Sequence, residues 1–308
     1  MKKILIFVSA VFAMLCVGAC QEETMDAVSE EVAVNVSVSL PIEQTKAMSE
    51  ADLVDIVYYE VWNSDMTVRL IPAAGEEPVS APVSGKTATL SLTLVSSQTY
   101  NFIFWAQNEA CGAYDVDDLQ KVGVDYSVIA AAGNQDKFDA FYAVEKIAVA
   151  GPINETVTLR RPFAQLNFGA DTMKTDLGDI TVGATSVKVS QLATVFNTIT
   201  GLGEDEQTDV VFQADGIATD EALVVNSKSY TWIAMDYMLM MADNDVVEVE
   251  AVFNVGMDAP VKQNIGNVPL KKNYRTNIVG DLFTANARLT IVVDPDFNQP
   301  DEVVDVEK

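Results

Sequence analysis

The sequence predicts an all-β protein made of two tandem, mostly antiparallel β-sandwiches. Three observations lead to this prediction. Several segments alternate apolar and polar residues with a period of two, helical periodicity is poor along the whole chain, and clusters of glycine, proline and asparagine separate the segments. The chain has 308 residues, 49% of them hydrophobic, which is enough for about two domains with cores of their own.

The first twenty residues have the pattern of an export signal. Two lysines precede the apolar residues 4–17, a stretch too short to span a ~30 Å hydrocarbon core comfortably. The following Val17-Gly18-Ala19-Cys20 resembles the bacterial lipobox, in which a signal peptidase cuts between Ala19 and Cys20 and the cysteine carries lipid. The alternative is an ordinary secretory signal cut after Ala19, with Cys20 incidental. We therefore expect residues 1–19 to be a lipoprotein signal peptide.

An acidic tether, residues 20–31, is expected to follow the signal peptide. Its Gln21-Glu22-Glu23 is similar to the signal that sends Bacteroidetes lipoproteins to the outer face of the outer membrane; a plain solvated tether is the alternative. Maturation would leave Cys111 as the only free thiol, so no intramolecular disulfide can form. Cys111 follows an apolar run and is expected to be buried and inert.

The first sandwich is predicted to span residues 32–159. Its clearest strand is residues 32–40, where four valines and Leu40 alternate with alanine, asparagine and serine before Pro41. Residues 54–61 and 88–94 are further predicted strands. Residues 100–106 and 141–148 are rich in aromatic and β-branched side chains, which is typical of strands buried on both faces.

The second sandwich is predicted to span residues 160–297, because Arg160-Arg161-Pro162 interrupts the chain before the apolar residues 163–168. Residues 247–253 and 289–293 alternate with a period of two and are predicted strands. The only helical candidates are short turns near residues 115–122 and 192–197. An acidic tail spans residues 298–308, and its residues 301–308 are expected to be disordered, although their valines could pair with the edge of a partner.

Charge and composition exclude several classes of function. The chain has 19 Lys and Arg against 45 Asp and Glu, and its net charge of −26 would repel a nucleic-acid backbone. It has no histidine, which excludes Ser-His-Asp and Cys-His catalysis and histidine-ligated zinc. The acidic residues 115–118 and 204–206 lack the spacing of a calcium-binding loop. We predict no catalytic, cofactor-binding or metal-binding residues, although a glycosidase with two carboxylates remains a distant alternative.

Three segments, in order along the chain, resemble the Bacteroidetes fimbrillin family of type V pilus subunits and related surface lipoproteins. They begin at Asp139-Ala140-Phe141-Tyr142-Ala143, at Leu159-Arg160-Arg161-Pro162-Phe163 and at Asn273-Tyr274-Arg275-Thr276-Asn277. The resemblance implies two transthyretin-like sandwiches in a lipid-anchored protein exposed on the outer membrane. It also implies adhesion, with other pilus subunits as partners through donor-strand exchange, outer-membrane lipid at Cys20, and host or bacterial surface ligands.

The alternating strand is the candidate for exchange. Removing a strand with an apolar stripe would leave a groove with two unpaired edges, which a strand of another chain can fill; its apolar residues are Val32, Val34, Val36, Val38 and Leu40. The alternative is that residues 32–40 are a permanent edge strand.

Family members are typically cut after an arginine in the connection that follows the first strand, but here Lys46-Ala47 occupies that place. An ammonium cannot reproduce the two-pronged contact of arginine. Lys46 and Ala47 are therefore the candidate maturation site for a lysine-tolerant protease. The departure favours an uncleaved anchor or accessory subunit as much as a stalk subunit.

A surface glycan-binding lipoprotein is the alternative function. It would need aromatic side chains exposed at one loop end, whereas Trp62, Trp105 and Trp232 lie in apolar runs that favour the core. Asp171-Thr172-Met173 resembles a Bacteroidetes O-glycosylation motif, which makes Thr172 a candidate acceptor.

Overall fold

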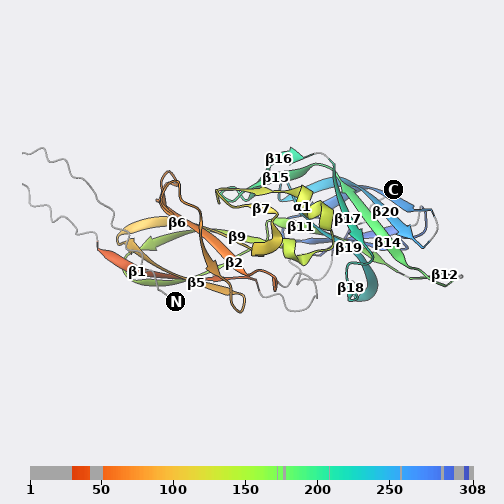
Figure 1. The fold of residues 1–308 in the computed structure, drawn as a ribbon, viewed down its shortest axis with the longest axis horizontal. Coiled ribbons are helices and arrows are strands. Elements are labelled where there is room, and N and C mark those ends of the chain that lie inside the picture. The colour runs from red at the N-terminus through yellow and green to blue at the C-terminus, as the bar shows by residue number, and fades with distance from the viewer. Residues whose placement is uncertain are drawn as a thin grey trace, which may run out of the picture.

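The computed structural model describes residues 30–41, 51–171, 173–175, 178–207, 209–256, 259–285, 288–294 and 302–304. These residues form an almost purely β protein, as predicted. Figure 1 shows an elongated molecule, with β1, β2 and β5 towards one end and β14, β17 and β20 towards the other. Two hydrophobic cores account for this shape, one in each half.

The smaller core lies between two sheets in the N-terminal half. One sheet has three strands in the order β10-β1-β5, and the other has the order β3-β2-β6-β9 with β4 also paired to β2. Apolar side chains of both sheets meet in a single buried cluster. The strands are β1 (Glu31–Ser39), β2 (Ile56–Trp62), β3 (Arg69–Ile71), β4 (Val79–Pro82), β5 (Thr87–Val95), β6 (Gln98–Gln107), β9 (Phe141–Val149) and β10 (Ile153–Thr158).

The larger core lies among three sheets, ordered β18-β19-β11-β22-β23-β24, β17-β14-β20-β21 and β16-β15-β8-β7, beside a small β12-β13 pair. Their strands are β7 (Tyr114–Asp115), β8 (Lys121–Val124), β11 (Phe163–Ala170), β12 (Lys174–Thr175), β13 (Gly178–Asp179), β14 (Val182–Val189), β15 (Leu192–Asn197), β16 (Leu202–Gln207), β17 (Val210–Asp215), β18 (Ala222–Val225), β19 (Lys228–Leu239), β20 (Asn244–Val255), β21 (Val261–Lys271), β22 (Arg275–Gly280), β23 (Leu289–Asp294) and β24 (Glu302–Val304).

Among the residues that the structure describes, helical structure is confined to short turns between β8 and β9 and before β7. They are α1 (Tyr126–Ile129) and three 3₁₀ turns, η1 (Glu109–Cys111), η2 (Ala130–Ala132) and η3 (Asp136–Phe138). The helical candidates at residues 115–122 and 192–197 were wrong: residues 115–122 are the end of β7, a non-helical connection and the start of β8, and residues 192–197 form β15. In β15 the buried Leu192, Ala193 and Phe196 have a helix-like spacing, but pairing with β8 and β16 makes the segment a strand.

The tail expected to be disordered contains a strand. Residues 302–304 form β24, which pairs antiparallel with β23 of the same chain. Not every pairing is antiparallel, since β1 pairs in parallel with β10, and β11 pairs in parallel with β22. In both sheets the strand with the parallel partner also has an antiparallel partner on its other side, β5 for β1 and β19 for β11.

Strands β6 and β9 of the first half contribute buried side chains to both cores. Because side chains alternate along a strand, Phe102 and Phe104 of β6 enter the smaller core while Ile103 and Trp105 enter the larger one. The excursion between β6 and β9, residues 111–140, also packs in the larger core. The division into residues 32–159 and 160–297 therefore stays a prediction about independent domains, and the two cores share strands.

A buried ion pair lies at the junction of the two cores. The Arg161 side chain is 1% exposed, and its Nε lies 2.8 and 2.9 Å from the carboxylate oxygens of Asp139 while its Nη2 lies 2.7 Å from Oδ2. The guanidinium also lies 4.6 Å from the ring centroid of Phe141. Asp139 and Arg161 belong to two of the three segments that resemble the fimbrillin family. Their ion pair therefore joins these segments where the two halves of the fold meet.

Candidate functional site

The candidate exchange strand β1 is an interior strand. All nine of its residues, from Glu31 to Ser39, pair antiparallel with β5, and residues 34–39 pair in parallel with residues 153–158 of β10. Further backbone bonds extend the ladder at the end of β1: the Leu40 N–H donates to Lys86 O at 2.9 Å, and the Leu159 N–H donates to Ser39 O at 2.9 Å. The alternative placed this strand at the edge of its sheet, and that placement is wrong because β1 has a partner on each side.

The predicted stripe of β1 faces the smaller core. Val34 and Val36 are fully buried, and Val32, Val38 and Leu40 are nearly so. Residues 33, 35, 37 and 39 lie on the other face and keep contact with solvent. Burial of the five apolar side chains stabilises the strand by roughly 5–10 kcal/mol as an upper bound, because the unfolded chain already buries some of this surface.

This one-sided burial distinguishes β1 from its counterpart β11. All eight residues of β11 are buried, so both faces of that strand are covered by the protein. Only one face of β1 is covered, and its outer face is small and polar. A strand entering the place of β1 would need apolar side chains only at alternate positions, whereas a replacement for β11 would have to match both faces.

A polar ladder on the outer face fixes the register of β1. Asn35 donates through Nδ2 to Asn154 Oδ1 at 3.0 Å, and its own Oδ1 accepts from the Ser91 hydroxyl at 3.0 Å. These three residues belong to β1, β10 and β5, so the ladder crosses all three strands. A shift of one residue would break it and would also turn the apolar stripe to solvent. The ladder therefore fixes the position of β1 relative to β5 and β10.

Several predicted site residues lie outside the described residues: Ala19 and Cys20 of the lipobox, Lys46 and Ala47 of the candidate cleavage site, and the candidate acceptor Thr172. Their roles stay predictions. In the part of the chain that is described, no helix has the length and hydropathy needed to cross a membrane. The described residues also bring no three Cys, Asp or Glu side chains together as a metal site.

The tryptophans and the cysteine lie largely as expected. Trp105 and Trp232 are buried in the larger core, whereas Trp62 is partly exposed and donates through Nε1 to Glu60 Oε2 at 2.8 Å. Two of the three rings are thus unable to stack on a surface ligand. Cys111 is buried, and desolvation raises the pKa of its thiol, which keeps it in the unreactive thiol form.

Sequence reasoning missed a buried carboxylate in β19. Asp236 is 5% exposed, and its Oδ1 has no hydrogen-bond partner among the described residues. Burial raises its pKa to about 7, while a hydrogen bond from the Asn134 backbone acts in the opposite direction. The sequence held no signal for it, because Asp236 lies in an apolar run and is enclosed by a loop from residues 131–135, about a hundred positions earlier.

Asp236→Asn is expected to flatten the dependence of stability on pH. The pKa is raised in the folded state, so the carboxyl stabilises the fold fully below pH ~3.8 and this contribution is lost as pH rises through about 7. The free energy of unfolding of the parent should fall by roughly 2 kcal/mol between pH 4 and pH 6 relative to the variant. Urea unfolding across this range measures it, with the exposed Asp215→Asn as control. Parallel curves for parent and Asp236→Asn would contradict the assignment.

Comparisons with known proteins agree with the fold. Among solved structures, a candidate adhesin from Bacteroides thetaiotaomicron is similar with a TM-score of 0.52 and 10% identity over 88% of this chain and 98% of that one. A candidate cell adhesion protein from Bacteroides ovatus has a TM-score of 0.50 and 12% identity over 91% and 100% of the two chains. Another candidate adhesin from Bacteroides ovatus has a TM-score of 0.50 and 11% identity over 92% and 100%.

No curated protein matches the sequence. One family model matches residues 25–307, and it is described as a family of unknown function, DUF6562. The match takes in every strand of the described structure, from β1 to β24. The chain therefore belongs to the DUF6562 family.

Proposed function

We propose that the chain is a non-enzymatic surface lipoprotein of fimbrillin type, either a pilus subunit or an anchor or accessory component, that joins other subunits by donor-strand exchange and serves adhesion. The single observation that carries this proposal is the placement of β1 between β5 and β10, with its apolar stripe in the core and its outer face polar. Similarity of fold to candidate adhesins of Bacteroides supports it.

The exchange would proceed in three steps: cleavage of the chain after β1, release of β1, and entry of a strand from another subunit. Cutting between Lys46 and Ala47 separates β1 from β2 but leaves its backbone pairing and its buried side chains in place, so the cut chain stays closed at first. Release of β1 then exposes an apolar groove between two unpaired strand edges. A strand from another subunit, apolar at alternate positions, fills the groove by pairing with β5 and β10 at once.

Attachment to the membrane is proposed through lipid on Cys20. An acyl chain contributes about 0.8 kcal/mol per buried CH₂, so a lipidated N-terminal cysteine holds a protein at a bilayer without a spanning helix. If Lys46-Ala47 is cut, the lipid leaves with the first strand, and the chain becomes a stalk subunit. If it is not cut, the protein keeps its lipid and its own β1, as an anchor or accessory subunit would.

The N-terminal residue and mass of the protein taken from native outer membranes test this proposal. A chain starting at acylated Cys20 supports an anchor or accessory role, and a chain starting at Ala47 within a polymer supports a stalk role. A mature chain that begins at an unmodified Cys20 and is found free in the medium would contradict both.

Cys20→Ala is expected to abolish lipidation and to move most of the protein from the detergent phase to the aqueous phase in detergent phase separation. Cys16→Ala is the matched control, because this cysteine lies within the signal peptide and is removed on maturation. Unchanged partition of Cys20→Ala would show that the anchor lies elsewhere.

A further inference from the structure

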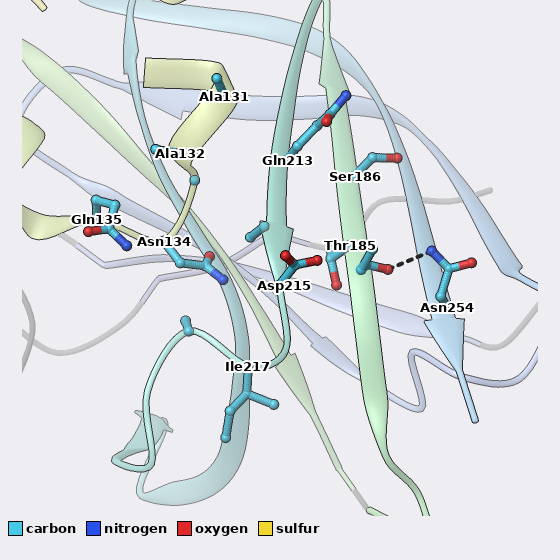
Figure 2. Close-up of a pocket in the computed structure, with 14 residues that line it drawn as sticks. Ala131, Ala132, Asn134, Gln135, Thr185, Ser186, Gln213, Asp215, Ile217 and Asn254 are labelled. Atoms are coloured by element: carbon cyan, nitrogen blue, oxygen red, sulfur yellow. Dashed lines mark hydrogen bonds between the residues drawn. The ribbon is translucent and has the colours of Figure 1, made fainter. Parts of the chain in front are cut away.

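A polar cleft opens at one edge of the larger half of the molecule. It is formed by the loop of residues 131–135, by parts of β14, β17 and β20, and by the segment that follows β17, and we refer to it as the edge cleft (Figure 2). Its volume is about 490 Å³, within the range of small-molecule sites. It lies outside the smaller core, so it is separate from the place of β1.

Backbone contacts hold the walls of the edge cleft in place. The Gly133 N–H donates to Gln213 O of β17 at 2.8 Å, and the Met235 N–H of β19 donates to Asn134 Oδ1 at 2.8 Å. The loop therefore bridges two sheets. A Cβ at Gly133 would lie 2.9 Å from Gln213 O and 3.0 Å from Asp236 Oδ1, so only glycine fits this approach.

The polar side chains that line the edge cleft are amides, hydroxyls and one carboxylate, set among alanines and Ile217. Asn134, Gln135, Gln213 and Asn254 supply the amides, and Asp215 supplies the carboxylate, as Figure 2 shows. Asn254 of β20 donates from its Nδ2 to Ala184 O of β14 at 2.8 Å. Figure 2 shows the carbonyl oxygen of the same amide pointing away from β14. These groups offer both donors and acceptors of hydrogen bonds.

A buried hydroxyl beside them lacks a partner. Thr185 of β14 lines the edge cleft, is 3% exposed, and its Oγ1 makes no hydrogen bond within the described part of the chain. Leaving a buried polar group unsatisfied costs about 1–3 kcal/mol, so such a group in a native protein calls for an explanation. A ligand hydroxyl within reach of Thr185 would satisfy it.

The charges of the edge cleft decide the class of ligand. No lysine or arginine is among the described residues that line it, and the chain carries a net charge of −26, so an anionic ligand would be repelled. Asp215 is the single carboxylate in the lining, fewer than the hard oxygen ligands that calcium requires. A neutral ligand rich in hydroxyl groups matches amides, hydroxyls and one carboxylate.

We propose that the edge cleft binds a neutral saccharide, whose hydroxyl groups pair with Asp215, Thr185 and the surrounding amides. The proposal gives a ligand class to the adhesion part of the proposed function, and it does not depend on exchange of β1. The described lining contains no aromatic ring on which a sugar could stack, so we expect a dissociation constant on the order of 1 mM for one site. Several subunits in one assembly would raise the overall avidity.

Saturation-transfer NMR on the uncleaved protein tests this, with glucose, galactose, mannose and N-acetylglucosamine as probes and glucuronate as the anionic comparison. At least one neutral sugar should bind, and glucuronate should not. Thr185→Val should weaken binding about tenfold without loss of stability, since it replaces an unpaired hydroxyl by a methyl group of the same shape. Asp215→Ala should weaken binding similarly, and Asp245→Ala, at the opposite end of β20, should leave it unchanged.

Three results would overturn the proposal. One is that none of the four neutral sugars binds at millimolar concentration. Another is that a sugar binds equally well to Thr185→Val, Asp215→Ala and the parent, which would place it elsewhere. The last is that no sugar binds while calcium, titrated alone by calorimetry, binds to the parent and not to Asp215→Ala. Because the protein in this experiment keeps β1 in place, none of these results bears on strand exchange.

Discussion

Val36→Asp is expected to destabilise the smaller core by about 4 kcal/mol. Val36 is fully buried in the middle of β1, opposite Leu90 of β5 and Glu155 of β10. A carboxylate there has to be desolvated or protonated, and the packing of the stripe is lost as well. Urea unfolding, followed by circular dichroism of the β structure, measures the change in the free energy of unfolding.

The matched control for Val36→Asp is Ser37→Asp. Ser37 is the next residue of the same strand and lies on its polar outer face, so the same carboxylate should cost less than about 1 kcal/mol there. Hydrogen exchange adds a local test: in Val36→Asp the amides of β5 and β10 should exchange faster than those of β19. Equal effects of the two substitutions would show that β1 is not held by its apolar face.

Arg161→Met is expected to destabilise the protein by about 3–5 kcal/mol, because it leaves the carboxylate of Asp139 buried without its cation. The two side chains are 1% and 2% exposed and lie 2.7 Å apart at the junction of the two cores. The measurement is urea unfolding at neutral pH.

The neighbouring arginine is the control. Arg160 is exposed, with its guanidinium 4.9 Å from the ring centroid of Tyr142, and Arg160→Met should cost less than about 1 kcal/mol. Asp139→Leu combined with Arg161→Met should be more stable than Arg161→Met alone, because no unpaired charge remains. A double variant less stable than the single one would mean that packing, and not charge, dominates at this junction.

The alternation of side chains predicted the strands well, because a strand that is buried on one face has apolar residues at every second position. Residues 32–40, 88–94 and 247–253 lie within or next to β1, β5 and β20, and the five apolar positions of the stripe are the buried ones. Residues 141–148 were only partly as predicted. The first three residues of β9 are buried, and only its last four residues alternate between exposed and buried.

The sequence could not predict which strands pair with one another. Alternation specifies which side chains of β1 face inward, and it is the same for an edge strand and for an interior one. The parallel pairing of Val34 with Ile153 joins residues 119 positions apart, and no local pattern encodes it. The edge cleft was missed for the same reason, since Gln135, Thr185 and Gln213 come together only through the loop that bridges two sheets.

The size of the protein after limited trypsin digestion and removal of the 21–46 peptide tests the central claim most directly. We predict that chains beginning at Ala47 stay closed while β1 remains bound, and form oligomers once it is removed. The Lys46→Gln variant, which trypsin cannot cut at this position, should stay monomeric throughout. Chains beginning at Ala47 that remain monomeric after loss of the peptide would contradict the account, and β1 would then be a permanent part of the fold.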